Sequence, residues 1–143
     1  MVVSFVAQDE MAGKEISEIH IRAGHLVDHI EFRYRDGSKA THGGNGGHVK
    51  EPFVLHPGEK LVSIKVQQGN SLDGCQFFLD SGRSSQWYGG RGGRSGSFEG
   101  SQHKPILNIR RPTQGFCPRI TDVVLQTQVT FDHFISLGHV SAV

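Results

Sequence analysis

The feature that most constrains this chain is a two-part motif that occurs twice in the same register. Each copy reads Gly-x-x-x-Asp, continues through a segment with strand character, and ends in Gly-Gly-x-Gly-Gly. The first copy comprises Gly24–Asp28 and Gly43–Gly47, and the second comprises Gly69–Asp73 and Gly89–Gly93. In-register duplication of both parts predicts a fold assembled from repeated units.

The residues around both motifs have the pattern of β-strands. Residues 16–24 align without gaps on residues 61–69, and both segments alternate apolar and polar residues near their ends. Residues 30–35 alternate again after the first motif, and the turn pairs Asp36-Gly37 and Ser81-Gly82 follow the second strand of each copy. No segment sustains helical spacing with caps. The sequence therefore predicts an all-β fold.

A third unit is recognisable but altered. Residues 106–109 and 123–125 read as its strands, and Asp122 precedes the second of them, but Pro118 stands where the other copies have glycine and no glycine loop follows. Three such units suit a three-sided prism of four-stranded sheets. We expect one domain over residues 1–143, with units at about 16–60, 61–105, and 106–143 completed by 1–15.

Composition excludes several classes of protein. The chain has 143 residues, 20% of them charged and 36% hydrophobic, which is neither disordered nor membrane-spanning. The net charge is +1 and the basic residues are scattered, so we expect no nucleic-acid partner. No apolar run is long enough for a transmembrane helix, and the start lacks the pattern of a signal peptide. We expect no membrane insertion and a mature secreted chain, with a cytosolic location as the alternative.

The repeated motif has the chemistry of a sugar pocket. An ionised Asp only accepts hydrogen bonds, free backbone N–H groups only donate them, and glycines let a ligand approach the backbone. Adjacent sugar hydroxyls match such a pocket, because each donates one bond and accepts another. The plainer alternative is that both motifs serve only to form turns.

Other site chemistries fit less well. A phosphate would be repelled by Asp28 and Asp73, and neither loop matches a nucleotide-binding motif. The nine histidines are dispersed, no catalytic pairing is evident, and we expect no metal, no cofactor and no enzyme activity. Of the two cysteines, Cys75 occupies a buried strand position. Cys117 lies in a probable loop, either as a free thiol or as an intermolecular disulfide.

At this point the chain resembles the jacalin-related lectins, a family with the β-prism I fold. The resemblance covers about residues 14–130 and rests on GHLVDHIEFRYRDGSKATHGGNGGHVKEPFVLHPGEKLVSI and GNSLDGCQFFLDSGRSSQWYGGRGGRSGSF. It implies three Greek-key four-stranded sheets with pseudo-threefold symmetry, no enzyme activity, and a shallow sugar pocket at one end of each intact unit.

The resemblance also implies which residues bind. The Asp carboxylates accept hydrogen bonds from the sugar hydroxyls. Backbone N–H groups donate hydrogen bonds to the sugar, both from the turn residues before each Asp and from the last glycine of each loop. The leading glycines permit the turn. Site 1 then consists of Gly24, His25, Leu26, Asp28, Gly46 and Gly47; site 2 consists of Gly69, Asn70, Ser71, Asp73, Gly92 and Gly93. Trp87 or Tyr88 would stack beside site 2 or merely pack at the strand end, and Arg91 would reach into it.

The departures from the family pattern are equally informative. The third site, marked by Asp122, is degenerate and is expected to bind poorly or not at all. The N-terminus shows no sign of the cleaved Gly amine that the galactose-preferring branch uses, which favours α-linked mannose or glucose. We therefore expect a multivalent, non-catalytic lectin that binds glycans or glycoproteins as a homodimer. The alternative is a structural or extracellular-matrix interaction protein with vestigial pockets.

Overall fold

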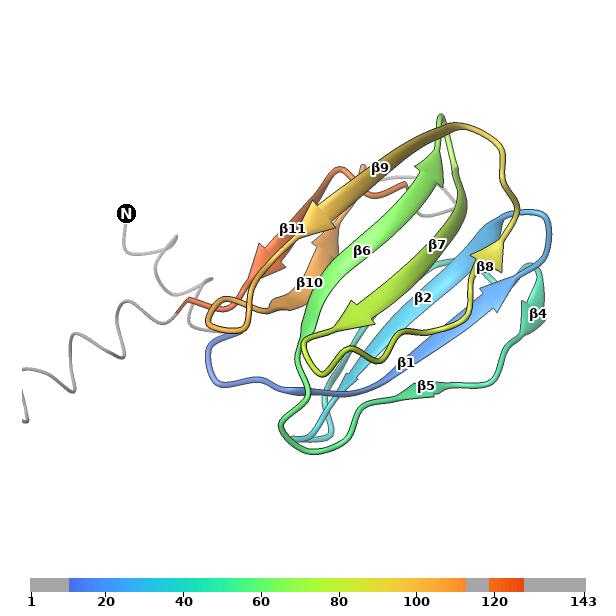
Figure 1. Ribbon diagram of the computed structural model, residues 1–143. Coiled ribbons are helices and arrows are strands. Elements are labelled where there is room, and N and C mark those ends of the chain that lie inside the picture. Colours follow the sequence, from blue (N-terminus) through green and yellow to red (C-terminus); the bar gives the residue numbers. More distant parts are fainter. Residues whose placement is uncertain (1–10, 113–118, 128–143) are drawn as a thin grey trace, which may run out of the picture.

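The computed structural model describes residues 11–112 and 119–127, and within them the chain forms eleven strands and no helix (Figure 1). None of these described residues belongs to a helix long and apolar enough to cross a membrane. The strands are β1 Ile16–Ala23, β2 Val27–Tyr34, β3 Lys39–Gly43, β4 His48–Val49, β5 Phe53–Val54, β6 Leu61–Gln68, β7 Leu72–Leu79, β8 Tyr88–Gly89, β9 Arg94–Glu99, β10 Ile106–Arg110 and β11 Asp122–Leu125.

Strand pairing follows the same plan around both copies of the motif. β1 pairs antiparallel with β2, and β6 with β7, and each pair carries irregularities in register at the same two places, near its start and just before the turn. The β10–β11 pair repeats the first of these irregularities. An antiparallel pair with the same irregularity near its start therefore occurs three times.

The outer strands differ between the units. The second sheet has the order β8-β7-β6-β9 and four strands, as predicted. The first has five strands, because its fourth strand is broken into β4 and β5, both paired with β1. Pro52 stands in this break, and proline cannot donate to a ladder. The third sheet has two strands among the described residues. Of the segment 1–15 that was expected to complete it, residues 1–10 lie outside the described residues and residues 11–15 form no strand.

The inner faces of the three hairpins meet in one core. Phe32 of β2 meets Phe77 of β7 edge to face, with ring centroids 6.3 Å apart, and Tyr88 packs against Phe77. The Tyr34 hydroxyl donates to the carbonyl of Leu107, at 2.5 Å, and so ties the first unit to the third. Cys75 is fully buried in this core, as predicted, and burial raises the pKa of its thiol.

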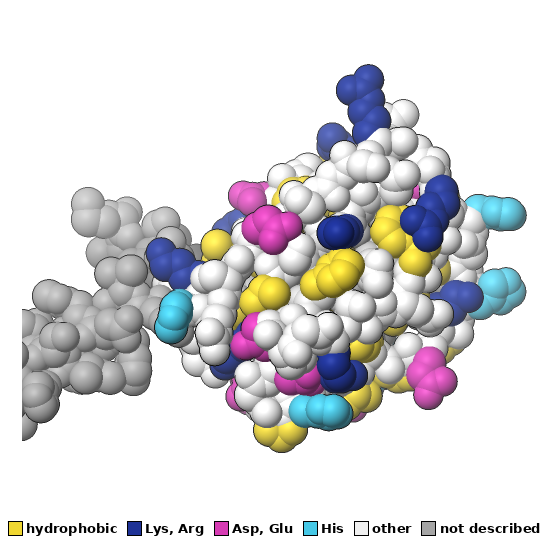
Figure 2. All heavy atoms as spheres, viewed as in Figure 1, with side chains coloured by type: hydrophobic (Ala, Val, Ile, Leu, Met, Phe, Trp, Pro, Cys, Tyr) yellow, Lys and Arg dark blue, Asp and Glu magenta, His cyan; other side chains and the backbone are white. Residues whose placement is uncertain are grey.

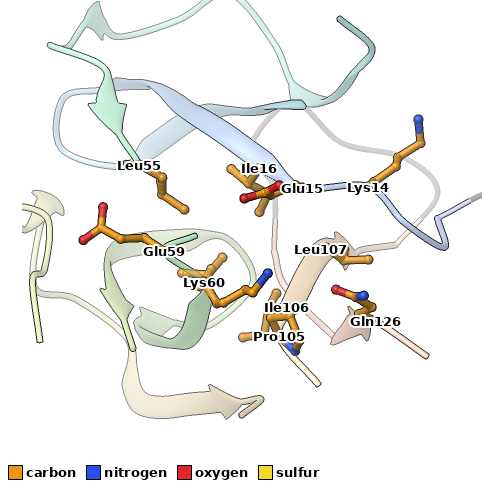
Figure 3. A pocket seen from close by; sticks show the side chains of 11 residues that line it. Lys14, Glu15, Ile16, Leu55, Glu59, Lys60, Pro105, Ile106, Leu107 and Gln126 are labelled. Atoms are coloured by element: carbon orange, nitrogen blue, oxygen red, sulfur yellow. The ribbon is translucent and has the colours of Figure 1, made fainter. Parts of the chain in front are cut away.

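The strand starts converge at the end of the molecule away from the glycine loops. The matching residues Ile16, Leu61 and Ile106 line a narrow cavity there, with a rim that includes Glu15 and Lys60 (Figure 3). Its volume of about 10 Å³ is at the lower limit for holding one water molecule. Among the described residues, this cavity is therefore too small for a sugar, and both glycine loops lie at the other end of the strands.

His42 fixes the seam between the first and third sheets. Its Nδ1 accepts a hydrogen bond from Nε of Arg111 at 3.1 Å, so Nε2 carries the proton and donates to Oδ1 of Asn108 at 2.7 Å. Burial lowers the pKa of His42 below 6.5, and the charges of Arg111 and His29 lower it further, against the opposing effect of the Asn108 bond. Folding therefore favours the neutral form of this ring.

This arrangement predicts acid-sensitive stability. The pKa of His42 is lower in the folded chain than in the unfolded chain. As the pH falls below about 6.5, the unfolded chain therefore binds a proton at His42 more readily, and the free energy of unfolding falls. Chemical denaturation between pH 7.5 and pH 5, as rough limits, measures the slope. His42→Gln should flatten it, whereas His103→Gln, at an exposed position, should leave it unchanged; equal slopes in all three proteins would contradict the assignment.

Candidate functional site

The first glycine loop folds back over the Asp of the first motif. After β1 the chain turns tightly, with the amide of Gly24 donating to the carbonyl of Leu26 at 2.9 Å, and Asp28 follows in β2. The amide of Gly44 donates to the carbonyl of Asp28 at 3.0 Å, which anchors the loop. The half-buried Asp28 side chain thus lies between the turn and the loop.

Close approach explains the glycines at the end of this loop. A Cβ atom at Gly46 would lie 2.8 Å from Oδ1 of Asp28, and one at Gly47 would collide with Oδ2. Gly47 also has φ of 70°, in the left-handed region that favours glycine. The loop therefore fits against the carboxylate only because these two side chains are absent.

The second copy repeats this geometry. The amide of Gly69 donates to the carbonyl of Ser71 at 3.0 Å, and that of Gly90 to the carbonyl of Asp73 at 2.7 Å. A Cβ atom at Gly92 would lie 3.1 Å from Oδ1 of Asp73, and one at Gly93 would lie 2.7 Å from Oδ2. The structure thus brings the sequence-predicted residues of each motif together, with the same contacts in both.

The leading glycines have a different role from the one expected. Neither Gly24 nor Gly69 has positive φ, and a Cβ atom at either would meet no atom within 4 Å. The prediction that they permit the turn is therefore wrong. Their lack of a side chain instead leaves open space in front of the turn.

The polar groups of both pockets point to a ligand that donates and accepts. Within residues 11–112 and 119–127, the carboxylates of Asp28 and Asp73 make no hydrogen bond or ion pair. The amides of the intervening turn residues likewise make no hydrogen bond there; these residues are His25, Leu26, Asn70 and Ser71. Each pocket therefore offers an unpaired acceptor beside unpaired donors, a pairing that suits vicinal hydroxyls.

Two residues that the sequence analysis did not single out hold the loops in place. Arg22 donates from Nε to the carbonyl of Gly46, at 2.9 Å, and from its terminal nitrogen to that of Gly47. Gln67, at the matching position of β6, donates to the carbonyl of Arg91 at 3.2 Å. A long polar side chain at the same place in both aligned strands is the signal that would have found them.

Of the two aromatic residues beside site 2, Tyr88 packs at the strand end, and one face of Trp87 is covered by Arg91. Tyr88 is 2% exposed and belongs to the core, so it cannot stack on a ligand. Trp87 donates from its indole nitrogen to the carbonyl of Gly90 at 2.9 Å, and the guanidinium of Arg91 lies over its ring at 4.2 Å. Arg91 therefore covers the indole face that would otherwise be free.

The third motif differs from the other two in its carboxylate. Asp122 is exposed at the start of β11, and its Oδ1 accepts a hydrogen bond from the amide of Val123 at 2.8 Å. Pro118 and Cys117 lie outside the described residues, and so does the choice between a free thiol and an intermolecular disulfide at Cys117. Among the described side chains, no group of three His, Cys, Asp or Glu is arranged to hold a metal ion.

The two intact pockets are neighbours at one end of the prism. A Cβ atom at Gly90 would lie 2.5 Å from the carbonyl oxygen of His25, and one at Gly89 would lie 3.1 Å from the Val27 side chain. The second glycine loop thus starts against the first turn and ends over Asp73, spanning the distance between the two hairpin turns (Figure 1).

Comparison with known proteins agrees with this geometry. A family model described as "Jacalin-like lectin domain" matches residues 5–110. The chain belongs to this family. The carbohydrate-binding family and the β-prism fold predicted from the sequence are thereby confirmed, and the family is in general non-catalytic.

Solved structures give the same fold. Wild-type Malaysian banana lectin is similar with a TM-score of 0.61 and 21% identity, over 75% of this chain and 79% of that one. AcmJRL, a mannose-binding jacalin-related lectin from Ananas comosus, has a TM-score of 0.57 and 24% identity, over 78% of each chain. Artocarpin bound to mannopentose has a TM-score of 0.65 and 15% identity, over 78% and 83%. No curated protein sequence matches the chain.

The close fit of loop and carboxylate predicts unequal costs of adding a methyl group. Gly93→Ala combines strain at φ 79° with contact to Asp73 and the backbone of Gln68, whereas Gly58→Ala meets φ 89° in open space. The control should lose about 1 kcal/mol and Gly93→Ala about 1–3 kcal/mol more, measured by chemical denaturation. Equal losses would show that the loop does not rest on the carboxylate.

Proposed function

We propose that the chain is a divalent lectin that binds α-linked mannose or glucose in two pockets, one formed by Gly24–Asp28 with Gly43–Gly47 and the other by Gly69–Asp73 with Gly89–Gly93. The observation that carries the proposal is that the carboxylates of Asp28 and Asp73 have no partner among the described residues and lie beside backbone donors that have none there either, against the loop glycines. The same constellation occurs in both units, although their side chains differ.

The choice of sugar is supported by two lines of evidence. The turn amides and the carboxylate match hydroxyls on adjacent ring carbons, and charge-assisted bonds to the carboxylate would contribute about 1.5–3 kcal/mol each. The Ananas comosus relative is described as mannose binding, and artocarpin was solved with mannopentose and with mannotriose. Both relatives share the fold of this chain, which is what makes their ligands informative here.

Weak single sites make the number of sites important. A shallow, open pocket with few contacts binds a monosaccharide at about millimolar Kd, or about −4 kcal/mol. Two pockets on one rigid end allow simultaneous contact with two sugars of one surface, which raises the effective affinity without new contacts. We propose that the protein acts as a secreted homodimer, which would present four pockets.

Removing the carboxylates one at a time tests this function. Calorimetric titration with methyl α-mannoside should give two sites in the unaltered protein, one in Asp28→Ala and one in Asp73→Ala, and none in the double variant. Thermal stability should stay nearly unchanged, since neither carboxylate is bonded to another described residue. Asp122→Ala is the matched control and should retain both sites.

Two outcomes separate the alternatives. A folded protein that ignores mannose and glucose at millimolar concentration, in all variants, would overturn the proposal and favour a structural role for the prism. A large loss of stability in Asp28→Ala or Asp73→Ala without any change in sugar binding would show that the motifs serve only as turns.

A further inference from the structure

We infer that the second pocket, unlike the first, takes an anionic glycan, with a sulfate or carboxylate group of the sugar held by Arg94 and Arg119. This inference rests on the proposed function, because it assumes that Asp73 binds a neutral sugar ring next to these cations. It assigns the two pockets different ligands, which their shared motif does not indicate.

Gln68 places both arginines at the edge of the second pocket. Gln68 is the last residue of β6 before the Gly69–Asp73 turn, and Arg94 is its cross-strand partner in β9. The Gln68 side chain donates to the carbonyl of Ile120 at 2.8 Å and accepts from its amide at 2.9 Å. Because Ile120 is buried in the core, this pair of hydrogen bonds fixes the backbone of the preceding residue, Arg119, beside the turn.

A shallow hollow lies between the two arginines. Its volume is about 400 Å³, and it is lined by Gly69 and Asn70 of the turn, by Arg94 and Arg119, and by a floor that includes Phe98. The small residues of β9, Ser95 to Ser97, keep it open. The hollow therefore continues the second pocket along the core-facing side of β9, next to the third unit, with room for a further sugar residue or a bulky substituent.

The charges of this hollow are not compensated within the described part of the chain. Neither Arg94 nor Arg119 forms an ion pair or a side-chain hydrogen bond with another described residue, whereas Arg33, Arg35 and Arg83 are each paired with a glutamate. Both are exposed. Figure 2 shows Lys and Arg side chains projecting from the end of the molecule where β6 turns into β7. Exposed guanidinium groups bind sulfate and carboxylate oxygens directionally.

The first pocket lacks these features. Ala23 and His48 form the corresponding cross-strand pair. Ala23 stands where the second unit has Gln68, so no side chain there can bond to a neighbouring unit, and His48 stands where the second unit has Arg94. The nearest cation on its entering strand, Arg22, is already bonded to the carbonyls of Gly46 and Gly47. The positions that carry Gln68 and Arg94 at the second pocket therefore offer no guanidinium to an anionic substituent at the first.

The test isolates the second pocket with the Asp28→Ala variant. Calorimetry compares α-mannobiose with its monosulfated positional isomers and with the disaccharide that contains mannuronate. At least one anionic form should bind about tenfold tighter than the neutral sugar, as two exposed charge pairs allow. The advantage should shrink when salt is raised from about 0.05 M to about 0.5 M.

Matched variants in the same background assign the effect to the two arginines. Adding Arg94→Gln and Arg119→Gln should abolish the advantage of the anionic sugar and keep the binding of neutral mannobiose. Adding Lys39→Gln and Lys104→Gln removes the same charge at exposed positions near the end away from the glycine loops and should preserve the advantage.

Each remaining result decides one question. Equal binding of every anionic and neutral form would overturn this inference and leave the proposed function intact. Binding of inorganic sulfate as tight as that of the sulfated sugar would also overturn it, because no ring recognition would then be involved. Failure of all sugars to bind would overturn the proposed function itself.

Discussion

The structure depends on the burial of the inner faces of three hairpins against one another. No hairpin of this size holds its apolar face out of water alone, since an isolated two-stranded pair is marginally stable. The edge-to-face contact of Phe32 with Phe77 joins the first two units, and the bond from Tyr34 to the carbonyl of Leu107 joins the third. Each unit therefore supplies the surface that its neighbours need for folding.

This shared core explains why the ligand chemistry lies at one end. The strands enter the core together at Ile16, Leu61 and Ile106, which line the narrow cavity, and leave it together at the hairpin turns. In the first two units, the bulge before the turn re-aims the chain, and the glycine loops return over the turns from the outer strands. Apolar packing thus places the two intact pockets next to each other, with the second glycine loop against the first turn.

Much of the fold was predictable because the sequence repeats. The alignment of residues 16–24 with 61–69 predicted both entering strands, and both glycine loops lie against their Asp as the motif required. The break in the fourth strand of the first sheet was missed, although Pro52 was its visible cause. The roles of Arg22 and Gln67 were not predictable in the same way, because they depend on where the loop carbonyls point after folding.

Each site has a part that recurs in both copies of the motif and a part formed by side chains that differ between the copies. Only the recurring part can be predicted from the motif. Carboxylate, amides and glycines recur in both copies, so the recognition of hydroxyl groups follows from the motif alone. The variable positions of the motif differ between the copies: His25 corresponds to Asn70, Leu26 to Ser71, and Asn45 to Arg91. Arg91 then covers Trp87, and Gln68 reaches across to Ile120, contacts that no motif describes. Two pockets built on one backbone plan therefore share a common ligand chemistry while their rims, which come from different units of the prism, set different preferences.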